Sequence, residues 1–182
     1  MKRLIAVLIC ALILGGCATT HMIKSEEMPT VAPKPDSATL VIIRDTYFGG
    51  AIVFWNYLDQ KFIGETMGKS YFVTEVPPGP HYVISSTENT GVAHFNFKPQ
   101  KVYYLGQSVA MGLWRARTGG FYAMTEKDAT EAMKSCTYYR YNSNTNAPDL
   151  DPEVFKNAVA EYEAGIKDHP DAYKSLLEYD GQ

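Results

Sequence analysis

The sequence feature that most constrains the fold is a series of short extended segments between Ile52 and Ile84. Aromatic and β-branched side chains fill the segments, whereas Asp, Gly and Pro fill the breaks, as in Asp59-Gln60 and Pro77-Pro78-Gly79-Pro80. Alternation of this kind is typical of β-hairpins. This stretch therefore predicts paired β-strands closed by tight turns.

The same pattern continues on both sides and predicts seven strands, which recur at a spacing typical of an antiparallel sandwich or barrel. They are 38–44, 51–58, 61–67, 70–76, 81–86, 92–97 and 101–110. Apolar residues occupy both faces of 38–44 and 51–58, so these two strands are expected to be covered on both sides.

The pattern changes after Ala110. Residues 111–121 are interpreted as a loop or a last hairpin, and 138–149 as a loop. Helices are expected to start at Thr125 and Asp151, because each residue type caps a helix N-terminus and Pro152 suits the first helical position. The predicted helices are 125–135, 152–166 and 171–179. We predict an α+β fold, mainly β: an antiparallel β-sandwich with two or three C-terminal helices packed on it.

Within the hairpin region the sequence resembles a known family. Tyr57-x-Asp59, Lys61-x-Ile63-Gly64 and Pro77-Pro78-Gly79-x-His81 are similar to the PEGA type of small β-domain, and in particular to an uncharacterised bacterial lipoprotein family, the domain of unknown function numbered 2846. The resemblance covers about residues 37–110, and Gln60 departs from it because the family usually has Gly there. It implies a transthyretin-like or immunoglobulin-like sandwich in the cell envelope, and it implies no activity and no catalytic residues.

The N-terminus has the pattern of an export signal. Lys2 and Arg3 precede an apolar run, Leu4 to Leu14, that is too short for the roughly 20 residues of a membrane-spanning helix. Leu14-Gly15-Gly16-Cys17 follows and resembles the lipobox of bacterial lipoproteins. The resemblance implies removal of residues 1–16 and lipidation of Cys17; the alternative is an ordinary secretory signal with an incidental cysteine.

The lipobox resemblance also implies a location. Ala18, rather than Asp, favours export to the outer membrane in lipoproteins of the enteric type, so we expect a lipid anchor there with the domain facing the periplasm. Several acyl chains exceed the two signals needed for stable attachment. The segment after Cys17 is polar and contains three prolines, so 17–37 is interpreted as a lipidated N-terminus and flexible linker with an average reach of roughly 25 Å. Residues 38–124 would form the sandwich and 125–182 a helical extension.

Charge and cysteine content narrow the classes of partner. The chain has 17 Lys and Arg against 20 Asp and Glu, and loss of Lys2 and Arg3 leaves a net charge of −5. This balance argues against nucleic acid and against electrostatic binding of anionic lipids. Cys136 remains alone in the mature chain, so no internal disulfide can form. We favour a buried thiol over intermolecular pairing.

The sequence carries no evident motif for catalysis or metal binding. The four histidines, His21, His81, His94 and His169, lack metal-site spacing. The chain has no Gly-x-Ser-x-Gly nucleophile motif, and Cys136 has no neighbouring histidine in sequence. We therefore expect no metal, no cofactor and no enzymatic activity, although His81 or His94 could meet a carboxylate in a hydrolase site assembled from distant residues.

Aromatic content is the most informative excess, with 13 Tyr, 8 Phe and 2 Trp. Exposed aromatic faces bind glycans or peptides at a low entropy cost. The candidate ligand-binding residues are Trp55, Tyr57, Trp114, Phe121 and Tyr122. The alternative, which we favour, is that these side chains are core or are covered by the C-terminal helices.

The sequence therefore predicts a non-enzymatic envelope accessory module that binds another protein. A glycan- or peptidoglycan-binding lipoprotein that uses exposed aromatics is the alternative, and a hydrolase is a third possibility. The ligand, the oligomeric state and the pathway are not indicated.

Overall fold

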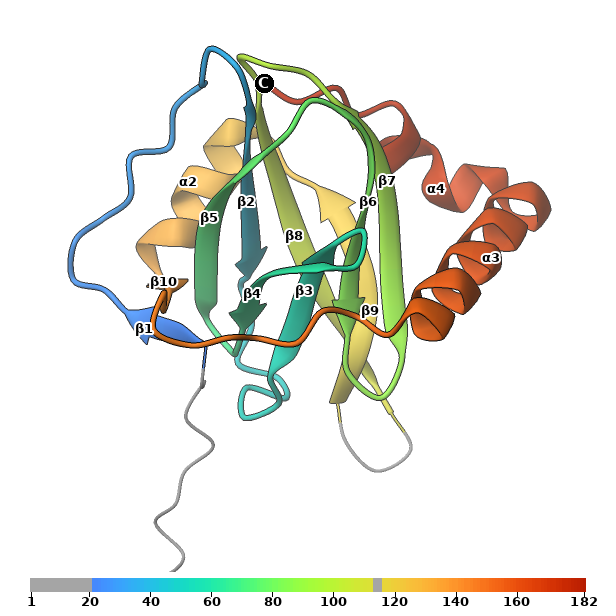
Figure 1. The fold of residues 1–182 in the computed structure, drawn as a ribbon, viewed down its shortest axis with the longest axis horizontal. Helices are drawn as coiled ribbons and strands as arrows, with labels where there is room; N and C mark the ends of the chain where they lie inside the picture. The colour runs from blue at the N-terminus through green and yellow to red at the C-terminus, as the bar shows by residue number, and fades with distance from the viewer. Residues whose placement is uncertain (1–20, 113–115) are drawn as a thin grey trace, which may run out of the picture.

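The computed structural model describes residues 21–112 and 116–182, which form two β-sheets packed face to face with helices outside them (Figure 1). The predicted class, α+β and mainly β, is confirmed. The strands are β1 (Met22–Lys24), β2 (Ala38–Arg44), β3 (Phe54–Leu58), β4 (Lys61–Thr66), β5 (Ser70–Val76), β6 (Gly79–Ser86), β7 (Thr90–Phe97), β8 (Val102–Met111), β9 (Ala116–Ala123) and β10 (Thr137–Tyr141). The helices are α2 (Glu126–Lys134), α3 (Pro152–Asp168) and α4 (Pro170–Leu177).

The larger sheet is mixed rather than purely antiparallel. Its order is β1-β10-β5-β2-β8-β9, and the β10–β5 and β2–β8 pairs are parallel. This corrects the antiparallel detail of our prediction. Parallel neighbours need a long connection between them. Here the chain between β2 and β8 supplies β5 and the whole of the second sheet.

The smaller sheet has the order β4-β3-β6-β7 and is antiparallel throughout, as the hairpin signals predict. Asp59 takes the left-handed conformation in the β3–β4 turn, with φ of 54°. Aspartate tolerates this conformation better than most residues. Gln60 therefore fits the turn without the glycine that the resembled family has at that position.

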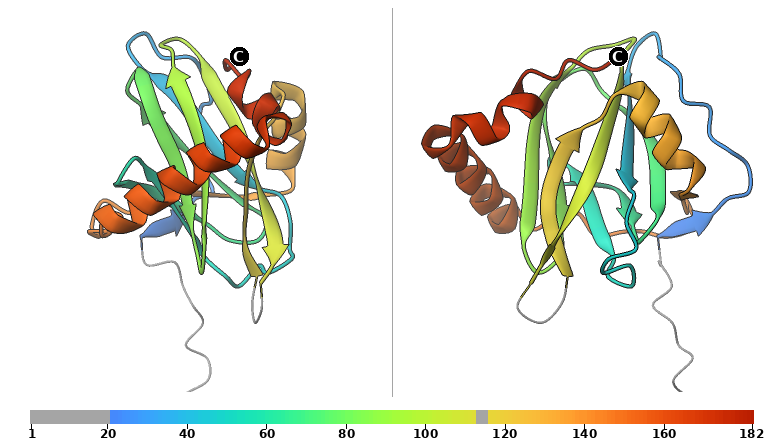
Figure 2. Two further views of the ribbon diagram at one scale, coloured as in Figure 1. Left: turned by 90° about the vertical axis from the view of Figure 1, so that its right-hand side faces the viewer. Right: turned by 180° about the vertical axis from the view of Figure 1, so that it is seen from behind.

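Three apolar clusters stabilise the fold. The central one lies between the sheets and includes Leu40, Ile42, Phe72, Val83, Phe95 and Leu105. On the outer face of the larger sheet, Ala129 and Ala132 of α2 pack against Val41, Ile43 and Tyr104. On the outer face of the smaller sheet, Ala147, Leu150 and Phe155 pack over Tyr57 and Ile84. Figure 2 shows α2 on one side of the sandwich and α3 with α4 on the other, so helices pack on the sandwich as predicted.

The helix starts follow the sequence signals. The Thr125 hydroxyl accepts a hydrogen bond from the Asp128 amide at 3.1 Å. Asp151 accepts from the amides of Glu153 at 2.8 Å and Val154 at 3.3 Å. These bonds satisfy backbone donors that would otherwise lack a partner in the first turn of each helix.

Two segments differ from the sequence-based prediction. Part of the linker forms β1, which pairs antiparallel with β10, and Met22 opposite Tyr141 is 5% exposed. The segment after β1 is also attached, because the Gln100 amide donates to the Lys34 carbonyl at 2.9 Å. β10 occupies part of the predicted loop 138–149, so residues 125–182 are not purely helical. β1 is the edge strand and β10 lies between β1 and β5; both are short and partly polar, which explains why the local pattern does not predict them.

Candidate functional site

The aromatic candidates are mostly packed rather than exposed. Tyr57 is 5% exposed and Phe121 is 8% exposed, so these two do not form an open platform, in agreement with the favoured interpretation that they are core or covered. The cause is the cover supplied by the C-terminal segment, which places Tyr57 in the outer apolar cluster. Tyr122 is 42% exposed and Trp55 is half-buried. Trp114 and Cys17 lie outside the described residues.

Tyr57 is also a poor acid at neutral pH. Burial, followed by the nearby carboxylates of Glu65 and Asp149, raises its pKa to about 12. Trp55 lines an open cavity of about 510 Å³ beside Thr87 and Glu88 of the β6–β7 turn. His21 contacts Trp55 edge-on, with ring centroids 5.4 Å apart.

The histidine candidates have structural roles in the fold. His81 Nδ1 lies 2.7 Å from Asp59 Oδ2, and the other oxygen of that carboxylate accepts from the Tyr82 amide at 2.9 Å. These contacts attach the β3–β4 turn to β6. His94 stacks on Tyr82, with centroids 4.6 Å apart. Among residues 21–112 and 116–182, no group of three or more His, Cys, Asp and Glu side chains is placed to hold a metal ion.

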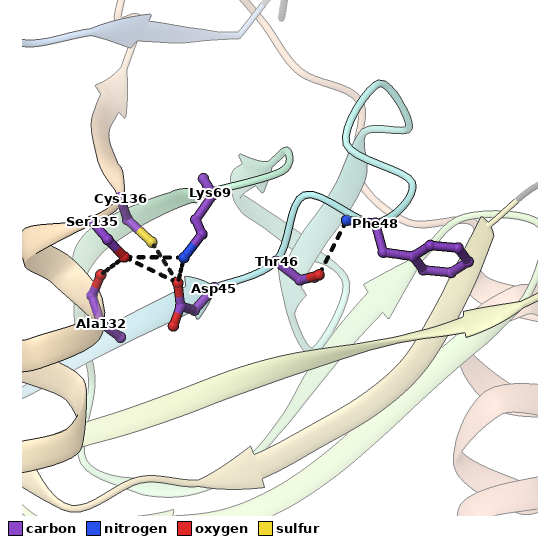
Figure 3. Close-up of polar contacts among 7 residues, drawn as sticks. All are labelled: Asp45, Thr46, Phe48, Lys69, Ala132, Ser135 and Cys136. Carbon is purple, nitrogen blue, oxygen red and sulfur yellow. Dashed lines mark hydrogen bonds and ion pairs between the residues drawn. The ribbon is translucent and has the colours of Figure 1, made fainter.

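A polar cluster around Asp45 connects the end of β2 with the end of α2 (Figure 3). Asp45 Oδ1 contacts the ammonium group of Lys69, and it lies 3.2 Å from Ser135 Oγ and 3.6 Å from Cys136 Sγ. The ammonium group also donates to Ser135 Oγ at 3.1 Å. One carboxylate therefore holds an ammonium, a hydroxyl and a thiol at the junction of three elements.

Cys136 is half-buried in this cluster, and it also packs against the apolar outer face of the larger sheet. Burial first, and then the Asp45 carboxylate, raises the pKa of its thiol to about 11. A thiol with this pKa is protonated at neutral pH, whereas the thiolate is the nucleophile. The cluster therefore fits a structural role better than cysteine-based catalysis.

Arg44 is a buried cation that sequence reasoning did not single out. Its side chain is fully buried at the end of β2, and burial lowers its pKa to about 10. The guanidinium donates to the carbonyls of Ile52 and Gly49, both at 2.6 Å, and of Phe48 at 3.2 Å. It also lies 3.9 Å from the ring centroid of Phe54. These contacts fix the loop between β2 and β3.

A second buried polar group joins the two sheets. The Gln107 amide on β8 donates to Asn56 Oδ1 at 2.7 Å and to Ser85 Oγ at 2.9 Å. Its carbonyl oxygen accepts from the Thr66 hydroxyl. The sequence signal for these residues is weak: Asn56 stands between aromatic residues, whereas Thr66, Ser85 and Gln107 each have a polar neighbour in the strand that does not share their role.

An open groove of about 580 Å³ lies between β9 and the helices α3 and α4. Gly91 and Gly120 bring the edges of the two sheets together at its base, where a Cβ on Gly91 would lie 2.8 Å from Gly120 Cα. Arg117 of β9 and Glu161 of α3 place one charge of each sign in the lining. On the helix side, Tyr173 is partly exposed and adds aromatic surface, whereas Tyr162 is only 5% exposed.

Comparison with known proteins gives a relative but no family. An uncharacterised protein of Haemophilus influenzae is 31% identical over 110 residues, which is 57% of this chain and 65% of that protein. The match thus spans less than two thirds of the relative. No model of a known protein family matches the chain, and no solved structure matches it. The resemblance to the lipoprotein family therefore stays a prediction.

No helix within residues 21–112 and 116–182 is both long enough and apolar enough to span a bilayer.

Proposed function

We propose that the protein is an outer-membrane lipoprotein, anchored through Cys17 and facing the periplasm, that binds a segment of another envelope protein and is not an enzyme. The observation that carries the binding part of this proposal is the groove between β9 and the α3–α4 helices. The anchor rests on the lipobox-like Leu14-Gly15-Gly16-Cys17.

Several properties of the groove favour a peptide segment as its ligand. It is open, and its lining is mixed, with Thr90 and Asn89 on one side and the partly exposed Tyr173 of α4 on the other. Tyrosine side chains bind peptides well because they offer rigid contact area and a polar group. Arg117 and Glu161 would orient a segment that carries both charges.

The other candidate sites support this choice indirectly. The Asp45 carboxylate and the high thiol pKa of Cys136 disfavour a cysteine nucleophile. Burial of Tyr57 and Phe121 removes two aromatics from the predicted glycan platform. The groove keeps Arg117, Glu161 and part of Tyr173 accessible and is therefore the better binding site.

The test is site-specific photocrosslinking in intact cells. A photoreactive residue replaces Arg117 or Glu161 in the groove, and the matched control places it at Glu153, which is exposed at the start of α3. We expect the two groove positions to capture the same discrete protein, the control to capture none, and the adduct to disappear in a Cys17→Ala variant.

Two outcomes would contradict the proposal. Equal crosslinking from Glu153 would mean that the groove is not the binding surface. Recovery of peptidoglycan fragments without a stoichiometric protein would instead favour the glycan-binding alternative, with the half-buried Trp55 beside its cavity as the next place to examine.

A further inference from the structure

We propose that the end of the sandwich formed by the β2–β3 loop and the end of β8 is a membrane-contact surface, whose exposed residues Tyr47, Phe48 and Met111 lie in the lipid headgroup region. This inference rests on the proposed lipid anchor at Cys17. It adds a second, direct contact between the folded domain and the bilayer, and it therefore fixes the orientation of the domain.

Sheet topology places these residues at one end of the molecule. β2 and β8 are parallel neighbours, with Ile43 opposite Gly106, so the chain leaves both strands at the same end. Tyr47 and Phe48 follow the end of β2, and Met111 is the last residue of β8. The β2–β3 loop also lies against the end of the β8–β9 pair. A Cβ added to Gly49 would lie 2.2 Å from Ala116 Cβ, and Ala116 is paired with Met111.

These three side chains are unusually open for their size. Tyr47 is 78% exposed, Met111 is 70% exposed and Phe48 is 46% exposed. Aromatic residues with a polar group, such as tyrosine, are enriched where a membrane meets water. Arg44 holds the carbonyls of Phe48 and Gly49, so the loop presents its side chains from a fixed backbone.

The attachment point lies at the same end. His21 packs against Trp55, the second residue of β3, and Figure 1 shows β1 at the same end of the sandwich as the β2–β3 loop. Cys17 precedes His21 by four residues, which span at most about 14 Å when fully extended. A lipid on Cys17 would therefore hold this end of the domain close to the bilayer surface.

The charges near this end fit a contact that does not depend on anionic lipids. Asp45 and Lys69 neutralise each other through their ion pair, and Arg44 is buried. The exposed Arg117, opposite Ala110 of β8, adds one cation beside Met111. The contact would thus be apolar and interfacial, in agreement with the net negative charge of the mature chain.

The experiment uses the full lipidated protein bound to preformed phosphatidylcholine vesicles. Tyr47→Cys and Met111→Cys carry a nitrobenzoxadiazole label, and the matched control is Leu177→Cys on α4, which is 47% exposed at a distance from the loop. Signal from the labelled parent protein, which contains Cys136, is subtracted. We expect the labels at 47 and 111 to shift to the blue and to lose most of their emission when doxyl-labelled lipid is added, whereas the label at 177 changes little.

Mass spectrometry of the same samples separates the two proposals. If Cys17 carries lipid and the protein binds vesicles, but the labels at 47 and 111 respond no more than the label at 177, the contact surface is refuted and the anchor stands. If Cys17 carries no lipid, the anchor fails and the inference fails with it.

Discussion

Replacement of Gln107 by Leu tests whether the buried polar group between the sheets is a major source of stability. Leu has nearly the same volume and removes the hydrogen bonds without opening a large cavity. The change leaves three buried side-chain groups without their Gln107 partner: Oδ1 of Asn56, the Ser85 hydroxyl and the Thr66 hydroxyl. Each orphaned buried group costs about 1–3 kcal/mol.

The three losses are coupled, because all three groups bond to one side chain. We therefore expect Gln107→Leu to lower the free energy of unfolding by about 3–5 kcal/mol. This is a large part of the roughly 5–15 kcal/mol that stabilises a typical domain. Urea unfolding followed by circular dichroism measures it as a lower transition midpoint at an unchanged slope.

The matched control is Gln60→Leu, an identical chemical change at an exposed turn position, which should alter stability by less than about 0.5 kcal/mol. A double-mutant cycle with Ser85→Ala should give a coupling of about 0.5–3 kcal/mol, since the two side chains are hydrogen bonded. A cost below about 1 kcal/mol for Gln107→Leu would refute the reasoning.

Three further changes address other contacts. Arg44→Met leaves the three loop carbonyls without a donor and should cost about 3 kcal/mol, with the exposed Arg140→Met as an almost silent control in urea unfolding. Tyr179→Phe removes a hydroxyl that accepts from the Tyr104 amide at 3.0 Å, and a loss of about 1–2 kcal/mol should appear as a lower melting temperature; no change would mean that α4 does not depend on this bond. Burial raises the pKa of the Glu65 carboxyl, so the contribution of this residue to stability is greatest below its unfolded pKa and is lost as pH rises through the higher folded pKa. The free energy of unfolding, measured at a series of pH values, should therefore fall for the parent protein relative to Glu65→Gln as pH rises. A difference between the two proteins that stays constant with pH would contradict this.

Local signals in the sequence were sufficient for most of the elements. Strands β2 to β8 lie close to their predicted ranges, and the helix starts at Thr125 and Asp151 have the expected capping bonds. These features depend on neighbouring residues, through alternation, turn chemistry and capping. The interpretation of 111–121 as a possible last hairpin agrees with the β8–β9 pairing of the described residues.

Features that depend on distant residues could not be predicted in the same way. The β1–β10 pair joins Met22 to Tyr141, and the parallel β2–β8 pair joins Thr39 to Val102. Neither pairing leaves a mark in the local pattern. Arg44 and Gln107 were missed because a polar residue in a strand gives no sign of whether it faces solvent or a buried partner. For a related reason the sequence could not show which residues cover Tyr57, because the covering residues lie near position 150.

In the proposed lipoprotein, the β1–β10 pair would also set an order of events during export. β1 comes early in the described sequence, but it would pair only after residues 137–141 had crossed the inner membrane and joined the sheet. Closing so long a loop is slow compared with forming the local hairpins. In the proposed lipoprotein, the lipid on Cys17 would thus be joined to the growing domain by the whole unpaired segment up to β2 for most of the folding time. The short, oriented attachment would form late, so a chain truncated before Thr137 would keep its anchor but lose its fixed distance from the membrane.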